Sequence, residues 1–219
     1  MALAFPLSLN RFLNTFKLVS NVFNLPGLVE YEETQGGEII TVARGAPLWE
    51  GHLVAHFTTP SAADATVSTL RLLQSPGASF LVRPPHRYGP VGDPTGAILG
   101  GAAPVISAVS ANTRDLTISG LPANYPGLTP GTFLSFVYDG GRRAFHQVVN
   151  GGNANPSGVR IVEVVPPIRP GWSAGAAVTL LSPTLTAKVV PGSVEPPVQG
   201  ARRGTAIGFA WCQTLERLA

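Results

Sequence analysis

Two histidines four residues apart, His52 and His56, form the pair whose spacing best suggests a metal site. On a helix, His-x-x-x-His presents both imidazoles to one zinc ion. The residues from 48 to 58, however, alternate between apolar and polar, which predicts a strand with Trp49 and Phe57 on the opposite face. Four residues of strand separate the two imidazoles by roughly 13 Å, too far for each to lie ~2 Å from one ion. We therefore expect no metal-binding residues.

Nucleophilic and acid–base centres are not expected either. Neither Pro191-Gly-Ser-Val194 nor Pro76-Gly-Ala-Ser79 fits the Gly-x-Ser-x-Gly motif of serine hydrolases. The single cysteine, Cys212, falls between Trp211 and Gln213 in a predicted strand, which predicts a packed structural thiol. The aspartates show no paired spacing for acid–base work; they are Asp64, Asp93, Asp115 and Asp139.

The chain also has no Gly-x-Gly-x-x-Gly or Walker-type phosphate loop. We thus predict a protein that is not an enzyme, with no catalytic or cofactor-binding residues and no cofactor. The net charge is +3 and the basic residues are scattered, which gives no indication of specific nucleic-acid binding. The two basic doublets, Arg142-Arg143 and Arg202-Arg203, are interpreted as solvated turns. One cysteine allows no intrachain disulfide, so the fold does not depend on an oxidising compartment.

The first 94 residues show strand patterns and one helix pattern. Alternation and turn residues predict strands at 16–24, 37–44, 48–58 and 78–83. Ser61 and Asp64 have the spacing of an N-terminal cap pair, with an apolar stripe at Ala63, Val67 and Leu70 following at helical spacing. The aromatic residues near the N-terminus predict core packing, with a latch onto a neighbouring subunit as the alternative; they are Phe5, Phe12, Phe16 and Phe23.

Short strands separated by glycine-rich turns follow, a pattern typical of a small barrel. The predicted strands are 105–109, 115–118, 132–138, 145–149, 160–165 and 177–181. Tight turns are expected at Asp139-Gly-Gly141 and Asn150-Gly-Gly152, with Gly151-Gly-Asn153 read as a hairpin turn.

Two late strands, 185–190 and 205–215, flank a proline-rich connector, 192–204. Ile207, Phe209 and Trp211 share one face of the last strand, which we expect to cover the open edge of the N-terminal sheet and to pack on the helix. The sequence therefore predicts a mainly β fold, a β-sandwich or half-barrel with one helix, carrying an inserted small β-barrel. Residues 1–94 plus 184–219 would form the first domain and residues 95–183 the insertion.

Charged residues make up only 12% of the 219 residues, against roughly 25% in an average soluble domain. The mean hydropathy is +0.22. This composition predicts that much of the surface is buried against other copies or partners; the alternative is a monomer covered by Ser, Thr and Asn. The uncharged run 94–113 is interrupted by glycines and Pro104, so we expect no membrane anchor. Residues 1–6 lack the pattern of a signal peptide.

Several segments resemble tail proteins of long-tailed bacteriophages and related prophages, and their order is most similar to a distal tail protein, a structural protein of the tail tip. The segments are Gly36-Gly-Glu-Ile-Ile40, Leu48-Trp-Glu-Gly51, the helix at 61–73, Pro76-Gly-Ala-Ser-Phe-Leu-Val82 and Phe209-Ala-Trp-Cys-Gln-Thr-Leu215. The stretch from Leu128-Thr-Pro-Gly-Thr132 to Pro166-Pro-Ile-Arg-Pro-Gly171 resembles the small barrel inserted in several tail-tip proteins.

The resemblance implies a homo-oligomer, a hexameric ring that connects the tail tube to the hub, with DNA passing through the lumen without specific binding. It implies location in the virion after assembly in the host cytoplasm. The alternative is a monomeric ligand- or carbohydrate-binding β module. Such a module would need an exposed aromatic platform, for which the candidates are Trp172, Tyr125 and Tyr138.

Overall fold

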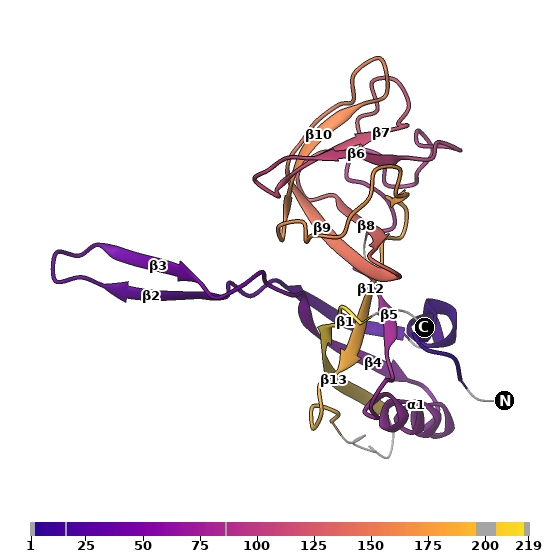
Figure 1. Cartoon of the computed structure of the whole chain (residues 1–219). Coiled ribbons are helices and arrows are strands. Elements are labelled where there is room, and N and C mark those ends of the chain that lie inside the picture. The colour runs from indigo at the N-terminus through magenta and orange to yellow at the C-terminus, as the bar shows by residue number, and fades with distance from the viewer. Residues whose placement is uncertain (1–2, 16, 86, 196–204, 217–219) are drawn as a thin grey trace.

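The computed structural model describes residues 3–15, 17–85, 87–195 and 205–216. Its strands form a five-stranded sheet, a six-stranded sheet and a separate two-stranded hairpin, and the one α-helix lies beside the five-stranded sheet (Figure 1). The predicted mainly β fold is therefore confirmed, with a half-barrel as the first part. Within the described residues, no helix is long and apolar enough to cross a membrane.

The five-stranded sheet joins both ends of the chain. Its order is β1 (Lys17–Asn24), β4 (Glu50–Phe57), β13 (Thr205–Gln213), β12 (Leu185–Val189) and β5 (Phe80–Val82). The last strand lies antiparallel to β4 from Thr205↔Phe57 to Cys212↔Glu50. The predicted return of the C-terminal strand to the N-terminal sheet is thus observed.

One face of this sheet is covered by the helix α1 (Pro60–Leu73) and by two short 3-10 turns, η1 (Leu9–Arg11) and η2 (Leu13–Thr15). Ile207, Phe209 and Trp211 are fully buried in one core with Leu70 of the helix. Phe12 is buried in the same core, and Phe5 and Phe23 pack against it, which agrees with the core-packing interpretation of these aromatics. Phe16 lies outside the described residues.

The six-stranded sheet has its own core. Its order is β11 (Val178–Thr179), β8 (Phe133–Tyr138), β9 (Arg142–Asn150), β10 (Arg160–Val165), β7 (Asp115–Ser119) and β6 (Val105–Val109). The two ends of the sheet meet, because Val105 bridges Ala177 and the Val178 amide donates to the carbonyl of Pro104 at 2.8 Å. The sheet therefore closes into a small barrel. The division into a first domain of residues 1–94 plus 184–219 and an inserted domain of residues 95–183 stays a prediction.

Two local predictions are wrong, and one strand was missed. The helix begins at Pro60 after Thr59, so Ser61 is not its cap; proline has no amide to satisfy and its fixed φ suits the first helical position. Gly151-Gly-Asn153 is not a hairpin turn, since Gly152 bridges Leu128 and the chain turns back only before Arg160. A strand that the sequence analysis missed, β2 (Val29–Glu33), pairs with β3 (Ile39–Ala43).

Candidate interaction site

The hairpin of β2 and β3, hereafter the arm, projects away from both the barrel and the five-stranded sheet (Figure 1). Among the described residues, its two strands pair only with each other, and neither hydrophobic core contains any residue of the arm. An isolated two-stranded hairpin is at best marginally stable in water. The arm thus lacks, within the described part of this chain, the packing that normally holds such a hairpin in shape.

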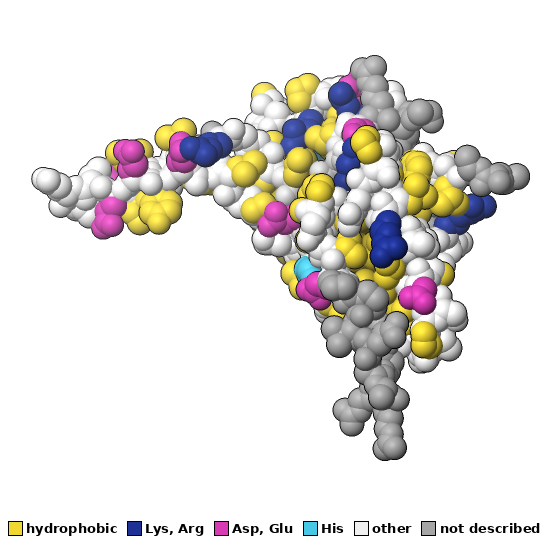
Figure 2. All heavy atoms as spheres, turned by 90° about the horizontal axis from the view of Figure 1, so that it is seen from below, with side chains coloured by type: hydrophobic (Ala, Val, Ile, Leu, Met, Phe, Trp, Pro, Cys, Tyr) yellow, Lys and Arg dark blue, Asp and Glu magenta, His cyan; other side chains and the backbone are white. Residues whose placement is uncertain are grey.

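Large apolar side chains are exposed on the arm. Tyr31 is 74% exposed and Ile39 63%, and Val29, Ile40 and Val42 are each about half exposed or more. Figure 2 shows hydrophobic and acidic side chains side by side along it. Because exposed apolar side chains on a strand with free edges favour pairing with another chain, this hairpin has the character of an interface.

The register of the hairpin places apolar side chains on both of its faces. Tyr31 lies opposite Thr41, which puts Tyr31 on the same face as Val29 and Ile39. Val42 and Ile40 lie opposite Glu30 and Glu32 on the other face. A partner that covered only one face would leave the other apolar side chains in water. The pattern therefore favours insertion between elements, or addition to a sheet, over simple contact on one side.

The arm is also strongly acidic. Residues 29–44 carry four glutamates and one arginine, so their net charge is −3, while the rest of the chain carries +6. The arginine, Arg44, forms an ion pair with Glu30. The other three glutamates place three negative charges within a few residues of each other; they are Glu32, Glu33 and Glu38. Electrostatic complementarity then favours a basic partner surface, and the body of this same protein is basic.

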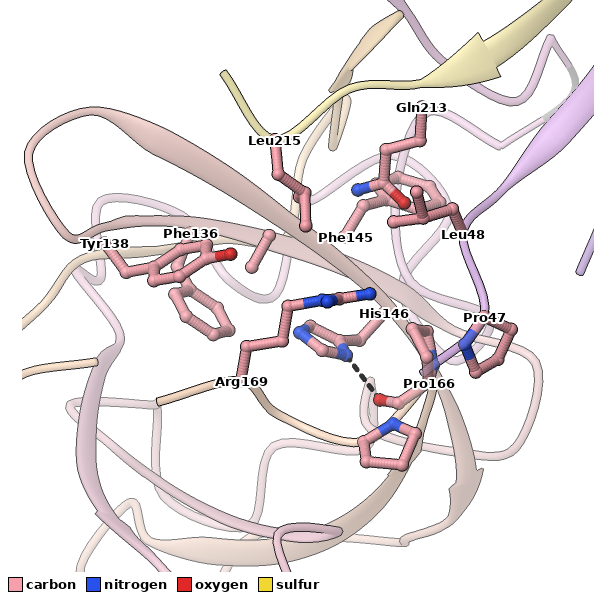
Figure 3. Close-up of a pocket in the computed structure, with 12 residues that line it drawn as sticks. Pro47, Leu48, Phe136, Tyr138, Phe145, His146, Pro166, Arg169, Gln213 and Leu215 are labelled. Atoms are coloured by element: carbon pink, nitrogen blue, oxygen red, sulfur yellow. Dashed lines mark hydrogen bonds between the residues drawn. The ribbon is translucent and has the colours of Figure 1, made fainter. Parts of the chain in front are cut away.

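A second feature is the junction between the two parts, where a cavity of about 10 Å³ leaves room for about one water molecule. Leu215 and Gln213 point toward it from the end of β13, and His146 and Arg169 lie on the barrel side (Figure 3). Small-molecule sites normally enclose ~300–1,000 Å³. This cavity is therefore too small to hold a ligand larger than water.

His146 is the buried titratable group of this junction, hereafter the seam. Its Nδ1–H donates to the carbonyl oxygen of Pro166 at 2.8 Å, and its ring stacks on Phe136 with centroids 5.5 Å apart (Figure 3). The pKa of His146 is lowered to about 4, mainly by burial; the bond to Pro166 opposes this shift, and the nearby Arg169 cation adds to it. The imidazole is thus neutral near pH 7 and serves as a hydrogen-bond donor in the seam.

The structure places the two histidines of the sequence analysis on the less buried side of β4. His52 lies 3.8 Å from a carboxylate oxygen of Glu195, and both histidines pair with β13 along the backbone, at Ala210 and Ala206. No group of three or more potential metal ligands occurs among the described residues.

The four aspartates have separate environments. The buried Asp93 accepts the amide of Leu99 at 2.8 Å and the hydroxyl of Tyr125 at 3.3 Å. Asp115 accepts the side-chain amide of Asn112. The other two are Asp64, exposed on the helix, and Asp139, paired with Arg142. Each carboxylate therefore has a structural environment of its own.

Two expectations about side chains are corrected. Cys212 is exposed and not packed, because Trp211 and Gln213 on either side point inward and strand alternation directs it outward. The pKa of its thiol is raised by partial burial and by the Glu50 carboxylate. Arg142 and Arg143 are not a solvated turn.

Both arginines begin β9 and are half-buried. The Nε–H of Arg142 donates to the carbonyl of Leu215 at 3.0 Å, which ties the barrel to the chain end. Burial lowers the pKa of Arg143, whose Nε has no hydrogen-bond partner among the described residues. The other basic doublet, Arg202-Arg203, lies outside the described residues, as does most of the connector 192–204.

The aromatic residues considered for a carbohydrate platform do not form one. Tyr125 is fully buried, and its pKa is raised mainly by that burial. Tyr138 is buried too, while Trp172 packs against the barrel core. Among the described residues, the large exposed aromatic side chains are Tyr31 on the arm and Tyr88 in the loop before the barrel.

The sequence analysis predicted the second strand of the arm but missed the first. This first strand, Val29-Glu-Tyr-Glu-Glu33, alternates apolar and acidic residues before the turn residues Gly36-Gly37, which is a hairpin pattern. Comparison with protein-family models and with curated proteins finds no match for this chain.

Proposed function

We propose that this protein is a structural component of a phage tail tip, forming a ring that connects the tail tube to the hub around the DNA channel. The arm is the observation that carries the proposal. It is a hairpin with apolar side chains on both faces and, within the described residues, no core of its own, so packing on another chain would stabilise it.

A second copy of this chain fits the arm by charge. The acidic arm has a net charge of −3 and the body one of +6, so arm-to-body contact between copies brings opposite charges together. Contact between two different surfaces of the same chain is heterologous, and such contacts form rings when the rotation between copies closes. The ring would be a hexamer within the virion, assembled in the host cytoplasm, with tube and hub proteins as neighbours and DNA in the lumen without specific binding.

The low charge content of the chain agrees with such an assembly, since interfaces remove neutral surface from water. This feature supports a structural role, which requires no catalytic reaction.

Self-association of the full chain tests the proposal. We expect the purified protein to form a discrete oligomer over a concentration series in sedimentation velocity. A double variant of the arm, Tyr31→Ser with Ile39→Ser, removes apolar contacts and should shift the protein to monomer. The matched control is Val149→Ser with Ile161→Ser, which removes two similarly exposed side chains from the barrel and should leave the oligomer intact.

Location is tested separately. Immunogold labelling with an antibody against the barrel should mark the tail tip of intact particles from the producing host. A wild-type protein that stays monomeric throughout the concentration series, or label found away from the tail tip, would contradict the proposed function.

A further inference from the structure

We propose that the arm of one copy adds to the free edge of β1 in the next copy, extending the five-stranded sheet across the subunit boundary. This inference rests on the proposed function, because it names the partner surface of the same arm. It follows from which strand edges of the body already pair with another segment of the same chain.

The far edge of the five-stranded sheet is covered by the chain itself. Leu7 bridges Phe80 of β5 in parallel, its amide donates to the carbonyl of Ser79, and its carbonyl accepts the amide of Leu81, both at 2.9 Å. In the barrel, the start of β6 and the chain leading into β11 bridge each other. Within the described residues, the edge of β5 and the start of β6 are therefore already occupied.

The edge of β1 is different. Within the described residues, β1 pairs with β4 on one side and with no strand on the other. Proteins commonly protect such edges with lysine, proline or a bulge. Here the bulge, between Leu18 and Ser20, and the lysine, Lys17, both lie at the start of the strand. The remainder, from Ser20 to Asn24, has no protecting residue of these kinds.

The exposed side chains of β1 match those of the arm. Val19 is 65% exposed and Val22 54%, so an added strand would cover apolar surface on both partners. Lys17 is the one charged residue of β1 and is opposite in sign to the arm. Backbone pairing at a sheet edge provides affinity, and the neighbouring side chains provide specificity.

The two symmetric alternatives are less favourable. Pairing of arm with arm would bring two acidic hairpins together, and like charges in cross-strand positions are destabilising. Pairing of β1 with β1 would leave both arms exposed. Pairing of the arm with the β1 edge covers both surfaces in one contact, and repeated head to tail this contact generates a closed ring.

Substitutions at Val22 test the acceptor edge. Val22→Asp and Val22→Lys remove the same apolar contact but introduce charges of opposite sign. We expect self-association of the Asp variant to be at least about tenfold weaker than wild type, and the Lys variant to associate more tightly than the Asp variant, because the arm is acidic. Ile161→Asp, on the barrel and 59% exposed, is the matched control and should associate as wild type.

Disulfide trapping between mixed variants identifies the contact directly. In a Cys212→Ser background, a full-length chain with Val22→Cys is mixed with a tagged chain carrying Tyr31→Cys or Thr41→Cys. Mild oxidation should give a mixed disulfide between the two chains with at least one arm position, and none when the tagged chain instead carries Ile161→Cys.

The outcomes separate the two proposals. Homodimers trapped only through Val22→Cys, or only through the arm, would overturn the head-to-tail contact in favour of a symmetric one. Undiminished association of Val22→Asp, or a Lys variant that associates no more tightly than the Asp variant, would refute β1 as the acceptor of the acidic arm while leaving the ring intact. A wild-type monomer would remove the ring itself.

Discussion

The indole Nε1–H of Trp49 donates a hydrogen bond to the backbone carbonyl of Phe145 at 3.0 Å, and the two rings meet edge to face with centroids 5.5 Å apart. Trp49 directly precedes β4 of the five-stranded sheet, whereas Phe145 belongs to β9 of the barrel. Phe133 stacks on Phe145 and also meets Trp49, so aromatic side chains of both parts share one cluster. Side-chain packing therefore holds the barrel against the sheet, in addition to the covalent connections of the chain.

Removing this hydrogen bond should weaken the seam. Trp49→Phe retains an aromatic ring but leaves the buried carbonyl of Phe145 without its donor, and we expect a loss of about 1–3 kcal/mol in the free energy of unfolding. Urea denaturation followed by far-UV circular dichroism measures it. Trp172→Phe, at a half-buried tryptophan of the barrel for comparison, should cost less; equal losses would contradict the role assigned to the Trp49–Phe145 bond.

A glycine in β4 is required by close packing. A Cβ atom on Gly51 would lie 1.8 Å from the carbonyl oxygen of Val22 and 2.6 Å from the indole of Trp211. Gly51→Ala should therefore destabilise the five-stranded sheet by at least about 2 kcal/mol, because the backbone of β1 must move. Gly101→Ala, at a site with open space around the added Cβ, should change stability by less than about 0.5 kcal/mol. Equal unfolding midpoints for the two variants would show that the backbone of β1 can move away from the added Cβ without loss of stability, which would contradict this prediction.

The buried His146 predicts a pH dependence of stability. Its pKa is lowered from 6.5 in the unfolded chain to about 4 in the folded protein, so below pH 6.5 the unfolded state binds the proton more readily. The contribution is fully present above pH 6.5, is lost as the pH falls toward 4, and amounts at most to about 3 kcal/mol.

Denaturation midpoints of wild type and His146→Gln, measured from pH 7 to 4, test this linkage. The wild-type midpoint should fall more steeply than that of the variant between pH 6.5 and 4. Parallel curves would mean that His146 is not held neutral by the fold. Carboxylates that titrate near pH 4 affect both proteins alike, so the difference between the curves isolates the histidine.

The order of strands predicts unequal effects of two deletions. Ending the chain before β13 removes the central strand of the five-stranded sheet and should unfold it, since Phe209 and Trp211 are fully buried in its core. Replacing residues 95–183 by a short linker should leave a folded but less stable sheet, because Phe133 and Phe145 of the barrel also pack on that core. One-dimensional proton NMR distinguishes the cases; a folded chain without β13 would refute this prediction.

Much of the fold could be predicted from the sequence because strand alternation is a local property. Leu53, Ala55 and Phe57 alternate with less buried residues and indeed face the core. The same rule, applied to Cys212, would have directed the thiol outward between the two inward residues beside it. The choice of a packed thiol followed a general trend for cysteine and not the local pattern.

The arm could be predicted only in part. Its alternation is the same whether a strand is covered or free, so the sequence shows that β2 and β3 can pair but not that they project from the body. Three glutamates in β2 further reduce its strand propensity. The bond from Arg142 to the carbonyl of Leu215 depends on the approach of the barrel to the end of the chain, a non-local relationship that no pattern within β9 contains.

Among the described residues, the arm contributes none to either hydrophobic core, so in the proposed assembly the residues of the arm that bind a partner would be separate from those that stabilise the fold. Substitutions at Tyr31 or Ile39 can change the assembly without altering the stability of the body. Selection can therefore tune subunit affinity, or redirect it to a new partner, without endangering the fold. An engineer could in the same way exchange the arm between related chains to produce rings of mixed composition.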